Sequence, residues 1–525
     1  MPILPTDIAT IKGALTIEKL FSVLSSVLKS QQILAGGFDP AKTEIVAGQA
    51  YPISSAARAA DLFGFGSQLH RMAIYFFAAN GAASPCVAFA LSAAIGGAAA
   101  TKTITFATDV TTAGTYIIRA GSYLDSDLAV IGASALATPT EIATLVAAAI
   151  TGKPNLPFTA AAALGVVTLT GKTIDVTSES LKVTINAKGD EYKQLPGAMT
   201  AIVADGIAGT GTSDLTDLWN YMLNSTTPWF TNLVQPYTDT IALDGAMNAI
   251  GNPNLQTGLY DELDYRPCHS YTVDTAGGFA AFDAAIVLGD SRKNIDPGNL
   301  RAAAPDYPEL GYEIAAYLSG FIALNAVLKS ASGYTRNQMT LLYGPLDPAE
   351  DWTTKYQPGV KPYRNVNAAV TAGITPIIFE NGSAHPGDVA TFWHPDDNQN
   401  APFKYVVNAR KTWNCQNLTD IYLNGTGLVD RPIVNSVAAV KQSENALDAD
   451  TITAGLALLA GVFEEFAWIY TGDFTITNMT VEESAENPDR FDIVMPLLLS
   501  GNYRVARAEL QVDRNTQIAD LKLVA

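Results

Sequence analysis

The feature that most constrains the fold is an alternation of strand and helix patterns that stops near residue 100 and resumes near residue 213. Before the break, strand patterns at residues 31–38, 51–53 and 86–91 alternate with helix patterns at 56–63 and 67–80. After the break, helix and strand patterns alternate again between residues 215 and 326. Such alternation is typical of a strand layer covered by helices. The sequence therefore predicts an α/β domain that an insertion interrupts.

The interrupting stretch differs in kind from its flanks. Residues 103–106, 115–118, 166–170 and 181–185 have strand patterns. Between them, Thr138 and Glu141 form a capping box, and Pro139 occupies the first position of a helix that runs to Ile150. We interpret this stretch as a small inserted α+β module.

Beyond residue 340 the chain is rich in Pro, Asp and Gly up to about residue 403, with a helix pattern at 366–372 and a strand pattern at 374–379. Helices at 406–423 and 450–469 and strands at 474–482, 491–498 and 503–512 are predicted to follow. The predicted fold class is α+β multidomain. Its parts are an N-terminal extended arm (1–30), an α/β middle domain (31–97 and 200–345), the inserted module (98–199), a C-terminal α+β domain (346–512) and a C-terminal arm strand (513–525).

The composition limits the partners of the chain. Only 16% of its 525 residues are charged, below the usual ~25%. Either copies of the chain cover much of its surface, or the core is large and rich in small residues. The net charge of −19 argues against direct contact with nucleic acid and against docking on anionic lipid, because both need clustered Lys and Arg.

The cysteines and the hydropathy pattern indicate a protein assembled in a reducing cytoplasm. Cys86, Cys268 and Cys415 are far apart and odd in number, so we expect buried free thiols and neither a disulfide framework nor a zinc site. The first residues lack the pattern of a signal peptide, and no run of ~18 apolar residues predicts a membrane span.

Two glycine-containing segments superficially resemble phosphate-binding loops. Gly171-Lys172-Thr173 resembles the end of a P-loop, but position 166 is Val166 where that loop needs glycine, and no helix follows. We expect a hairpin turn there. Residues 206–211 are rich in glycine, but their spacing does not match a dinucleotide loop and no clear strand precedes them. We expect a flexible return from the inserted module.

The histidines define no catalytic group. His385 and His394 lie near Asp388, Asp396 and Asp397, a set of residues that could bind a metal or act in acid–base chemistry, but no regular element fixes their spacing. His269 follows Cys268 directly, and neighbours on a strand point to opposite faces. His70 fits a packing or surface position on a helix. The sequence predicts no catalytic residue, no metal and no cofactor.

Five segments carry a resemblance to a known family. Residues 56–72, which include Phe63-Gly64-Phe65-Gly66-Ser67 and end at Met72, closely resemble the lFGxGSxLhrM segment of Mu-like phage tail sheath proteins. Residues 139–150 and 158–160 resemble the protruding domain of that family, 232–239 its vmPYtD strand, 365–374 its N.a..aGI stretch, and 486–492 its C-terminal NPDRfDv.lP hairpin. The segments follow the family order and span nearly the whole chain.

The resemblance implies the sheath subunit of a contractile phage tail or a related injection device, a structural protein and not an enzyme. Such subunits form stacked hexameric rings around a tail tube, and the sheath contracts to drive the tube through the host envelope for genome ejection. The implied partners are other copies of the chain, the tail tube protein, and baseplate and tail terminator proteins. The implied location is the virion tail, after assembly in the host bacterial cytoplasm.

The resemblance also implies that the terminal arms exchange strands with neighbouring subunits, by adding strands to a neighbour's sheet. The exchanged residues would include Ile8, Ile11 and Leu15 in the head arm and Ile518, Leu521 and Leu523 in the tail. The receiving C-terminal sheet would include Phe491, Ile493, Val505 and Leu510.

Two alternatives remain open. One is another structural virion component, such as a tube, baseplate or capsid protein. The other is a metal-dependent hydrolase that uses His385 and His394, with the inserted module as a lid.

Overall fold

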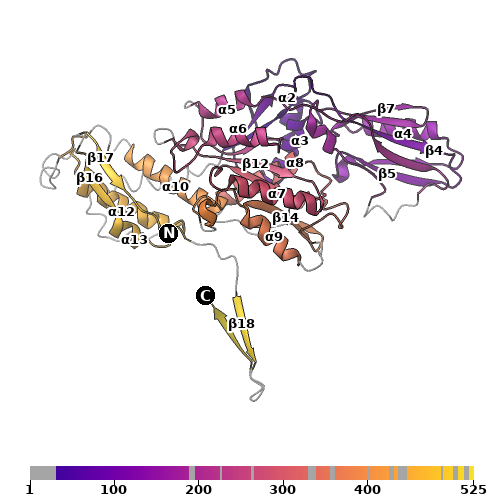
Figure 1. Ribbon diagram of the computed structural model, residues 1–525. Helices are drawn as coiled ribbons and strands as arrows, with labels where there is room; N and C mark the ends of the chain where they lie inside the picture. The colour runs from indigo at the N-terminus through magenta and orange to yellow at the C-terminus, as the bar shows by residue number, and fades with distance from the viewer. Residues whose placement is uncertain are drawn as a thin grey trace. The chain divides into compact units, whose positions relative to one another are not determined.

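A computed structural model (Figure 1) describes residues 31–187, 195–224, 227–261, 265–328, 339–354, 361–398, 401–424, 428, 431–434, 446–485, 487, 489–500, 507–512 and 519–524. The fold is mixed α+β with several sheets, as the sequence predicted. The chain divides into two compact units, and their boundary lies between residues 409 and 410. The larger unit holds the inserted module together with the strands that flank it in the sequence.

The larger unit outside the module, which we call the layer, consists of helices and loops around an eight-stranded sheet. Its strand order is β15 (Ser383–Pro386), β14 (Ile374–Glu380), β13 (Asn299–Ala303), β12 (His269–Asp274), β11 (Phe230–Val234), β1 (Gln31–Gly37), β3 (Cys86–Leu91) and β2 (Ala50–Ile53). The six inner strands are parallel, and the edge strands β2 and β15 pair antiparallel. The first strand, β1, therefore lies inside the sheet, between β11 and β3.

Helices cover both faces of the sheet because its inner strands are apolar on both sides. In β1, Leu34 belongs to the core under α3 (Gln68–Asn80) and α8 (Gly311–Leu328). Its neighbours Ile33 and Ala35 belong to the opposite core, under α5 (Thr216–Leu223) and α6 (Thr240–Ile250). A smaller core joins α7 (Gly278–Arg292) and α9 (Pro362–Thr371) to β13 and β14.

Local signals in the sequence set the first two helices. The hydroxyl of Ser55 accepts a hydrogen bond from Arg58 N at the start of α2 (Ala56–Phe63), and Gly64 ends that helix. Ser67 caps α3 in the same way, through His70 N. A β-carbon at Gly320 of α8 would lie 2.7 Å from the carbonyl oxygen of Phe76, so the glycine permits the close packing of α8 against α3.

Within its described residues, the inserted module has two antiparallel sheets and one α-helix (Figure 1). The larger sheet has the order β10 (Thr200–Asp205), β4 (Thr101–Ala107), β8 (Val166–Gly171) and β7 (Phe158–Ala163), and the smaller sheet the order β6 (Ala129–Ala133), β5 (Gly114–Ala120) and β9 (Val183–Ile185). The helix, α4 (Pro139–Thr151), packs against strands of both sheets. Its capping box between Thr138 and Glu141 is present as predicted.

The structure differs from the predicted boundaries at two places. Residues 200–205 were assigned to the middle domain, but they form β10, which pairs with β4 and completes the larger sheet of the module. Residues 374–386 were assigned to the C-terminal domain, but they form β14 and β15, and β14 pairs with β13 and extends the layer. In both cases the hydrogen-bond partner is distant in sequence, so no local pattern marks the sheet to which the strand belongs.

The smaller unit contains most of α10 (Val406–Leu423), α12 (Ala449–Glu465), α13 (Gly472–Asn478) and two hairpins. One hairpin pairs β16 (Thr480–Glu483) with β17 (Phe491–Val494), and the other pairs β18 (Arg507–Val512) with β19 (Ala519–Val524). The strand predicted at 474–482 is wrong over its first half. Residues 472–478 are helical because Thr471 caps Asp473 N, and this cap outweighs the β-branched residues.

Candidate functional site

The candidate catalytic and metal-binding residues are not brought together. His394 is buried, its Nδ1 lies 2.8 Å from the carbonyl oxygen of Phe392, and burial lowers its pKa. His385 pairs with Ile378 in the β14–β15 hairpin. Asp397 binds Lys293 at 2.5 Å. Among the described residues, no group of three or more His, Cys, Asp and Glu could hold a metal ion.

The three cysteines are buried free thiols, as predicted. Burial raises the pKa of Cys268 to about 12, so this thiol stays protonated at neutral pH. A protonated thiol is a poor nucleophile, so Cys268 and the neighbouring His269 do not form an activated nucleophile pair.

In the part of the chain that the structure describes, no helix is long and apolar enough to span a membrane.

The glycine segments connect the module to the layer. After Gly171 the chain leaves β8 and passes through a short 3-10 helix at Val176–Ser180, so the predicted hairpin turn is not present. Residues 206–211 do follow a strand, β10. They are also held in place, because Thr210 and Ala98 exchange two backbone hydrogen bonds and Gly209 N donates to Glu179. The expectation of a flexible return was wrong.

A buried ion cluster joins the module to the layer at Arg71. Its Nε donates to Glu313 Oε1 of α8 at 2.6 Å, and its Nη1 donates to Asp127 Oδ2 of the module at 3.2 Å. The same Nη1 lies 3.2 Å from Ser122 Oγ and 3.5 Å from the carbonyl oxygen of Asn155, both in the module. Burial alone would lower the pKa of Arg71, but the charge of Glu313 raises it above its ordinary value. Arg71 is therefore a buried cation that binds one acid of the module and one acid of α8.

The sequence patterns did not predict a role for Arg71. It lies in the segment that resembles the tail sheath family, but its partner Glu313 is 242 residues away. Arg71 is a charged residue in a helix that has little polar surface. The structure shows the same, since the neighbouring Leu69 and Met72 are also fully buried. A charge in such a helix needs a buried partner.

The glycine loop before α3 fits against the module. Gly64 and Gly66 both have positive φ, at 89° and 75°. A β-carbon at Gly66 would lie 2.2 Å from the carbonyl oxygen of Leu156 in the module. Gly66 N donates to Nδ1 of His70, which is buried, and burial lowers the pKa of His70 to about 4. His70 is thus a neutral packing residue of this junction.

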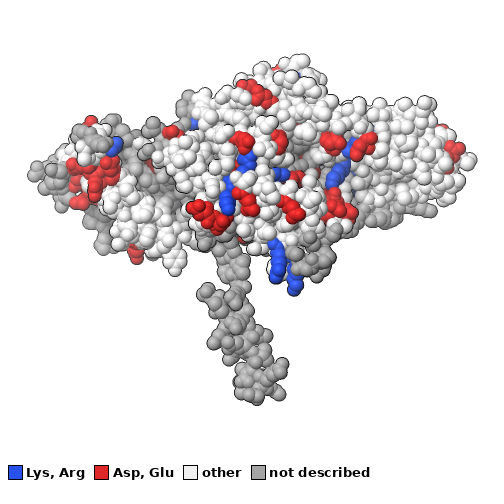
Figure 2. All heavy atoms as spheres, in the orientation of Figure 1, with Lys and Arg blue, Asp and Glu red and all other residues white. Residues whose placement is uncertain are grey.

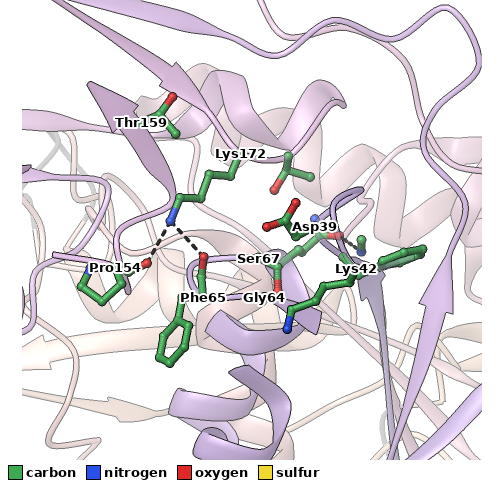
Figure 3. A pocket seen from close by; sticks show the side chains of 12 residues that line it. Asp39, Lys42, Gly64, Phe65, Ser67, Pro154, Thr159 and Lys172 are labelled. Atoms are coloured by element: carbon green, nitrogen blue, oxygen red, sulfur yellow. Dashed lines mark hydrogen bonds between the residues drawn. The ribbon is translucent and has the colours of Figure 1, made fainter. Parts of the chain in front are cut away.

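A cavity of about 490 Å³ lies at the same junction (Figure 3), between Asp39 and Lys42 of the layer and Pro154, Thr159 and Lys172 of the module. The ammonium of Lys172 donates to the carbonyl oxygens of Phe65 and Pro154, at 2.9 and 2.8 Å. The ammonium of Lys42 donates to the carbonyl oxygen of Asp61 at 2.6 Å. Both cations therefore bind main-chain oxygens, and Lys172 ties the glycine loop to the module.

The residues predicted to exchange strands lie partly outside the described residues, as Ile8, Ile11, Leu15, Val505 and Ile518 do. Phe491 and Ile493 lie on β17, whereas Leu510 lies on β18. Leu521 and Leu523 lie on β19, which pairs with β18 of the same chain. The described part of the predicted receiving sheet is thus divided between two separate hairpins.

Asn487, Asp489 and Arg490 of the NPDR segment lie between the two strands of the first hairpin. Ser484 N donates to the carbonyl oxygen of Arg490, and the Arg490 guanidinium binds both Ser484 and Asp492. These bonds fix the register of β16 against β17, in which Glu483 opposes Phe491. Arg490 therefore ties Ser484, which follows β16, to Asp492 on β17.

The second hairpin has a regular register. Ala508, Leu510 and Val512 of β18 oppose Leu523, Leu521 and Ala519 of β19, and these positions share one face. On the other face, Glu509 opposes Lys522 and Gln511 opposes Asp520. The hairpin is therefore amphipathic, with six apolar positions on one side.

No protein-family model and no curated protein matches the chain. The chain is similar to a sheath tail protein. That solved structure, from Desulfitobacterium hafniense, is 12% identical to this chain, with a TM-score of 0.44. The match covers 90% of this chain and 97% of that chain.

Charge is unevenly distributed on the face shown in Figure 2. Lys and Arg lie among Asp and Glu over the layer, whereas most of the visible face of the module is uncharged. Acidic side chains also gather over β16 and β17, where Glu482, Glu483 and Asp492 are exposed. Like charges on a two-stranded edge oppose its pairing with an identical edge.

Proposed function

We propose that the chain is the structural subunit of a contractile tail sheath, which polymerises with copies of itself through its terminal segments. Stacked hexameric rings would surround a tail tube, and contraction would drive that tube through the host envelope. The tail tube, baseplate and tail terminator proteins would be its other partners, in a virion tail assembled in the host cytoplasm. The ordered sequence segments that resemble tail sheath proteins, Mu-like ones in particular, motivate the proposal.

The amphipathic hairpin β18–β19 is the observation that carries the proposal. An isolated two-stranded hairpin is at best marginally stable in water. This hairpin has six apolar positions on one face, and burial against another surface would stabilise it. It lies at the end of the chain to which the resemblance assigns contact between subunits. A second copy of the chain is the partner that such a subunit meets most often.

The edge of β17 supports the proposal independently. Within the described residues β17 pairs only with β16, so its second edge has backbone groups available to another strand. Val494 at the end of β17 is 61% exposed, and Tyr470, whose backbone N donates to the carbonyl oxygen of Leu498, is 72% exposed. A strand from a neighbouring subunit would satisfy the backbone groups and cover the apolar side chains.

Electron microscopy of the purified full chain tests the proposal. We expect wide hollow cylinders or stacked rings for the intact chain. Chains that lack residues 1–20 or 513–525 should remain unassembled. Normal cylinders from both truncated chains would refute assembly through the terminal segments. Closed shells or thin tubes from the intact chain would favour another structural virion protein.

Two point variants test the hairpin more sharply. Leu510→Lys places a charge on the apolar face opposite Leu521, and we expect it to abolish cylinders or to raise the concentration needed for them at least tenfold. Gln511→Lys adds the same charge at the next position, on the polar face, and should assemble normally. Equal assembly of the two variants, measured by sedimentation, would show that the apolar face is not an interface.

A further inference from the structure

The junction between the module and the layer contains one buried cation and several buried acids. Arg71 binds Asp127 of the module and Glu313 of α8. A third carboxyl, that of Glu309, lies four residues before Glu313 in the chain and is also buried. Arg71, Glu313, Glu309 and Asp127 are all 0–2% exposed. With every acid ionised, one guanidinium would face three buried negative charges, which a low-dielectric interior strongly disfavours.

Glu309 also reaches the module by a second route. Its carboxyl accepts a hydrogen bond from Tyr343 N. The ring of Tyr343 lies 5.2 Å from the ring of Tyr123, and the guanidinium of Arg119 lies 5.1 Å from the ring of Tyr343. Tyr123 and Arg119 belong to the module. Glu309 therefore holds a segment of the layer on which the module rests.

One carboxyl oxygen of Glu309 is buried without a hydrogen-bond partner in the described part of the chain, which favours a neutral Glu309. Among the described residues, Glu309 Oε2 has no hydrogen-bond partner, and neither does Nη2 of Arg71 or the hydroxyl of Tyr307. An ionised carboxylate with one bare oxygen is costly to bury, whereas a protonated acid carries no net charge there. The charged groups that act on Glu309 are Glu313 and Arg71. The charge of Glu309 in turn helps burial to raise the pKa values of Tyr75, Tyr123 and Tyr307.

We propose that this junction is a proton-linked lock, in which Glu309 must carry a proton for the module to stay seated on the layer. Ionised Glu309 would compete with Asp127 for the guanidinium of Arg71 and repel Glu313. Closing the junction therefore takes up one proton, and opening releases it. The proposal concerns the single chain and does not depend on its assembly into a sheath.

The pKa of Glu309 gives the direction and the pH range. Burial raises this pKa from 4.5 to about 8. In the opened junction the carboxyl regains water and its ordinary pKa, so opening becomes easier as the pH rises from about 5 to about 8. Two such pKa values imply that the opening equilibrium increases about 50-fold between pH 6 and pH 8.

Hydrogen exchange of the full-length chain, corrected for intrinsic exchange rates, tests the lock. We expect the junction amides around Ser122–Asp127 and Asn155–Leu156 to lose protection by a factor of 10 to 50 between pH 6 and pH 8. Amides between β4 and β8, such as those at Ile104 and Val167, should keep their protection, because the module itself stays folded. Unchanged junction protection in the wild-type chain, or equal loss throughout the module, would overturn the proposal.

Glu309→Gln supplies the decisive variant, because glutamine imitates a protonated glutamic acid and still accepts from Tyr343 N. We expect its junction protection to be the same at pH 6 and pH 8. Glu380→Gln, at an exposed position on β14, is the matched control and should behave as the wild-type chain does. A Glu309→Gln chain that keeps the wild-type pH dependence would show that another group is responsible. If this variant does not fold, the wild-type comparison alone decides.

Discussion

At the scale of single residues, Gly66 has two independent reasons to be glycine. Its φ of 75° lies in the left-handed region, and a β-carbon would meet the carbonyl of Leu156. We expect Gly66→Ala to destabilise the protein by about 3 kcal/mol, the sum of backbone strain and overpacking. Calorimetric melting would measure the loss.

Gly132→Ala is the control for this change. Gly132 lies on β6 of the same module, has no positive φ, and a β-carbon there would meet nothing within 4 Å. This variant should melt within about 0.5 kcal/mol of the wild-type chain, as surface substitutions usually do. Equal melting of the two variants would mean that the glycine loop does not press on the module.

The contacts between the module and the layer could not be predicted from local sequence patterns, whereas the helix caps could. The cap at Thr138 was predicted, because it depends on residues within three positions along the chain, and the caps at Ser55 and Ser67 are equally local. The bond from Arg71 to Glu313 was not, because the two residues meet only after α3 has packed against α8. Local patterns identify elements, whereas the pairing of buried charges depends on the tertiary fold.

At the scale of elements, helix α4 depends on its capping box. Thr138 Oγ1 accepts from Glu141 N, and the Glu141 carboxylate accepts from Thr138 N, which lowers the pKa of Glu141. We expect Thr138→Ala to cost about 1 kcal/mol, the usual value for loss of an N-cap. Thr144→Ala changes the same residue type at an exposed position inside the helix, and should be neutral or slightly stabilising. Urea unfolding followed by circular dichroism would contradict this assignment if both changes had the same effect.

Elements whose ends are marked by nearby residues were predicted correctly, whereas strands defined by distant pairing partners were not. Helices α2 and α3 begin and end within a residue of their predicted limits, because caps and glycines mark both ends. Strands β13 and β15 were missed, since β13 is short and polar residues interrupt its pattern. The C-terminal hairpin was expected as two separate strands, and only backbone pairing reveals that they face each other.

At the scale of the whole molecule, the net charge of −19 opposes association of identical copies. If the proposed assembly buries mainly apolar and backbone surface, added salt should screen this repulsion and favour polymers. We expect cylinders to form faster when sodium chloride is raised from about 20 to about 200 mM, where the Debye length falls from roughly 20 Å to below 10 Å. Light scattering would follow the rate. Slower assembly at high salt would instead indicate interfaces dominated by ion pairs.

The central place of β1 has a consequence for synthesis on the ribosome. β1 can pair with β3 as soon as residue 91 has emerged, but its other neighbour, β11, begins only at residue 230. At ~5–20 residues per second, the ribosome needs on the order of ten seconds to make the chain between these strands. During that interval one edge of β1 waits without its final partner, next to a module whose last strand, β10, is completed at residue 205. The insertion can therefore finish folding before the layer closes, and the nascent chain must protect a bare parallel edge until β11 arrives.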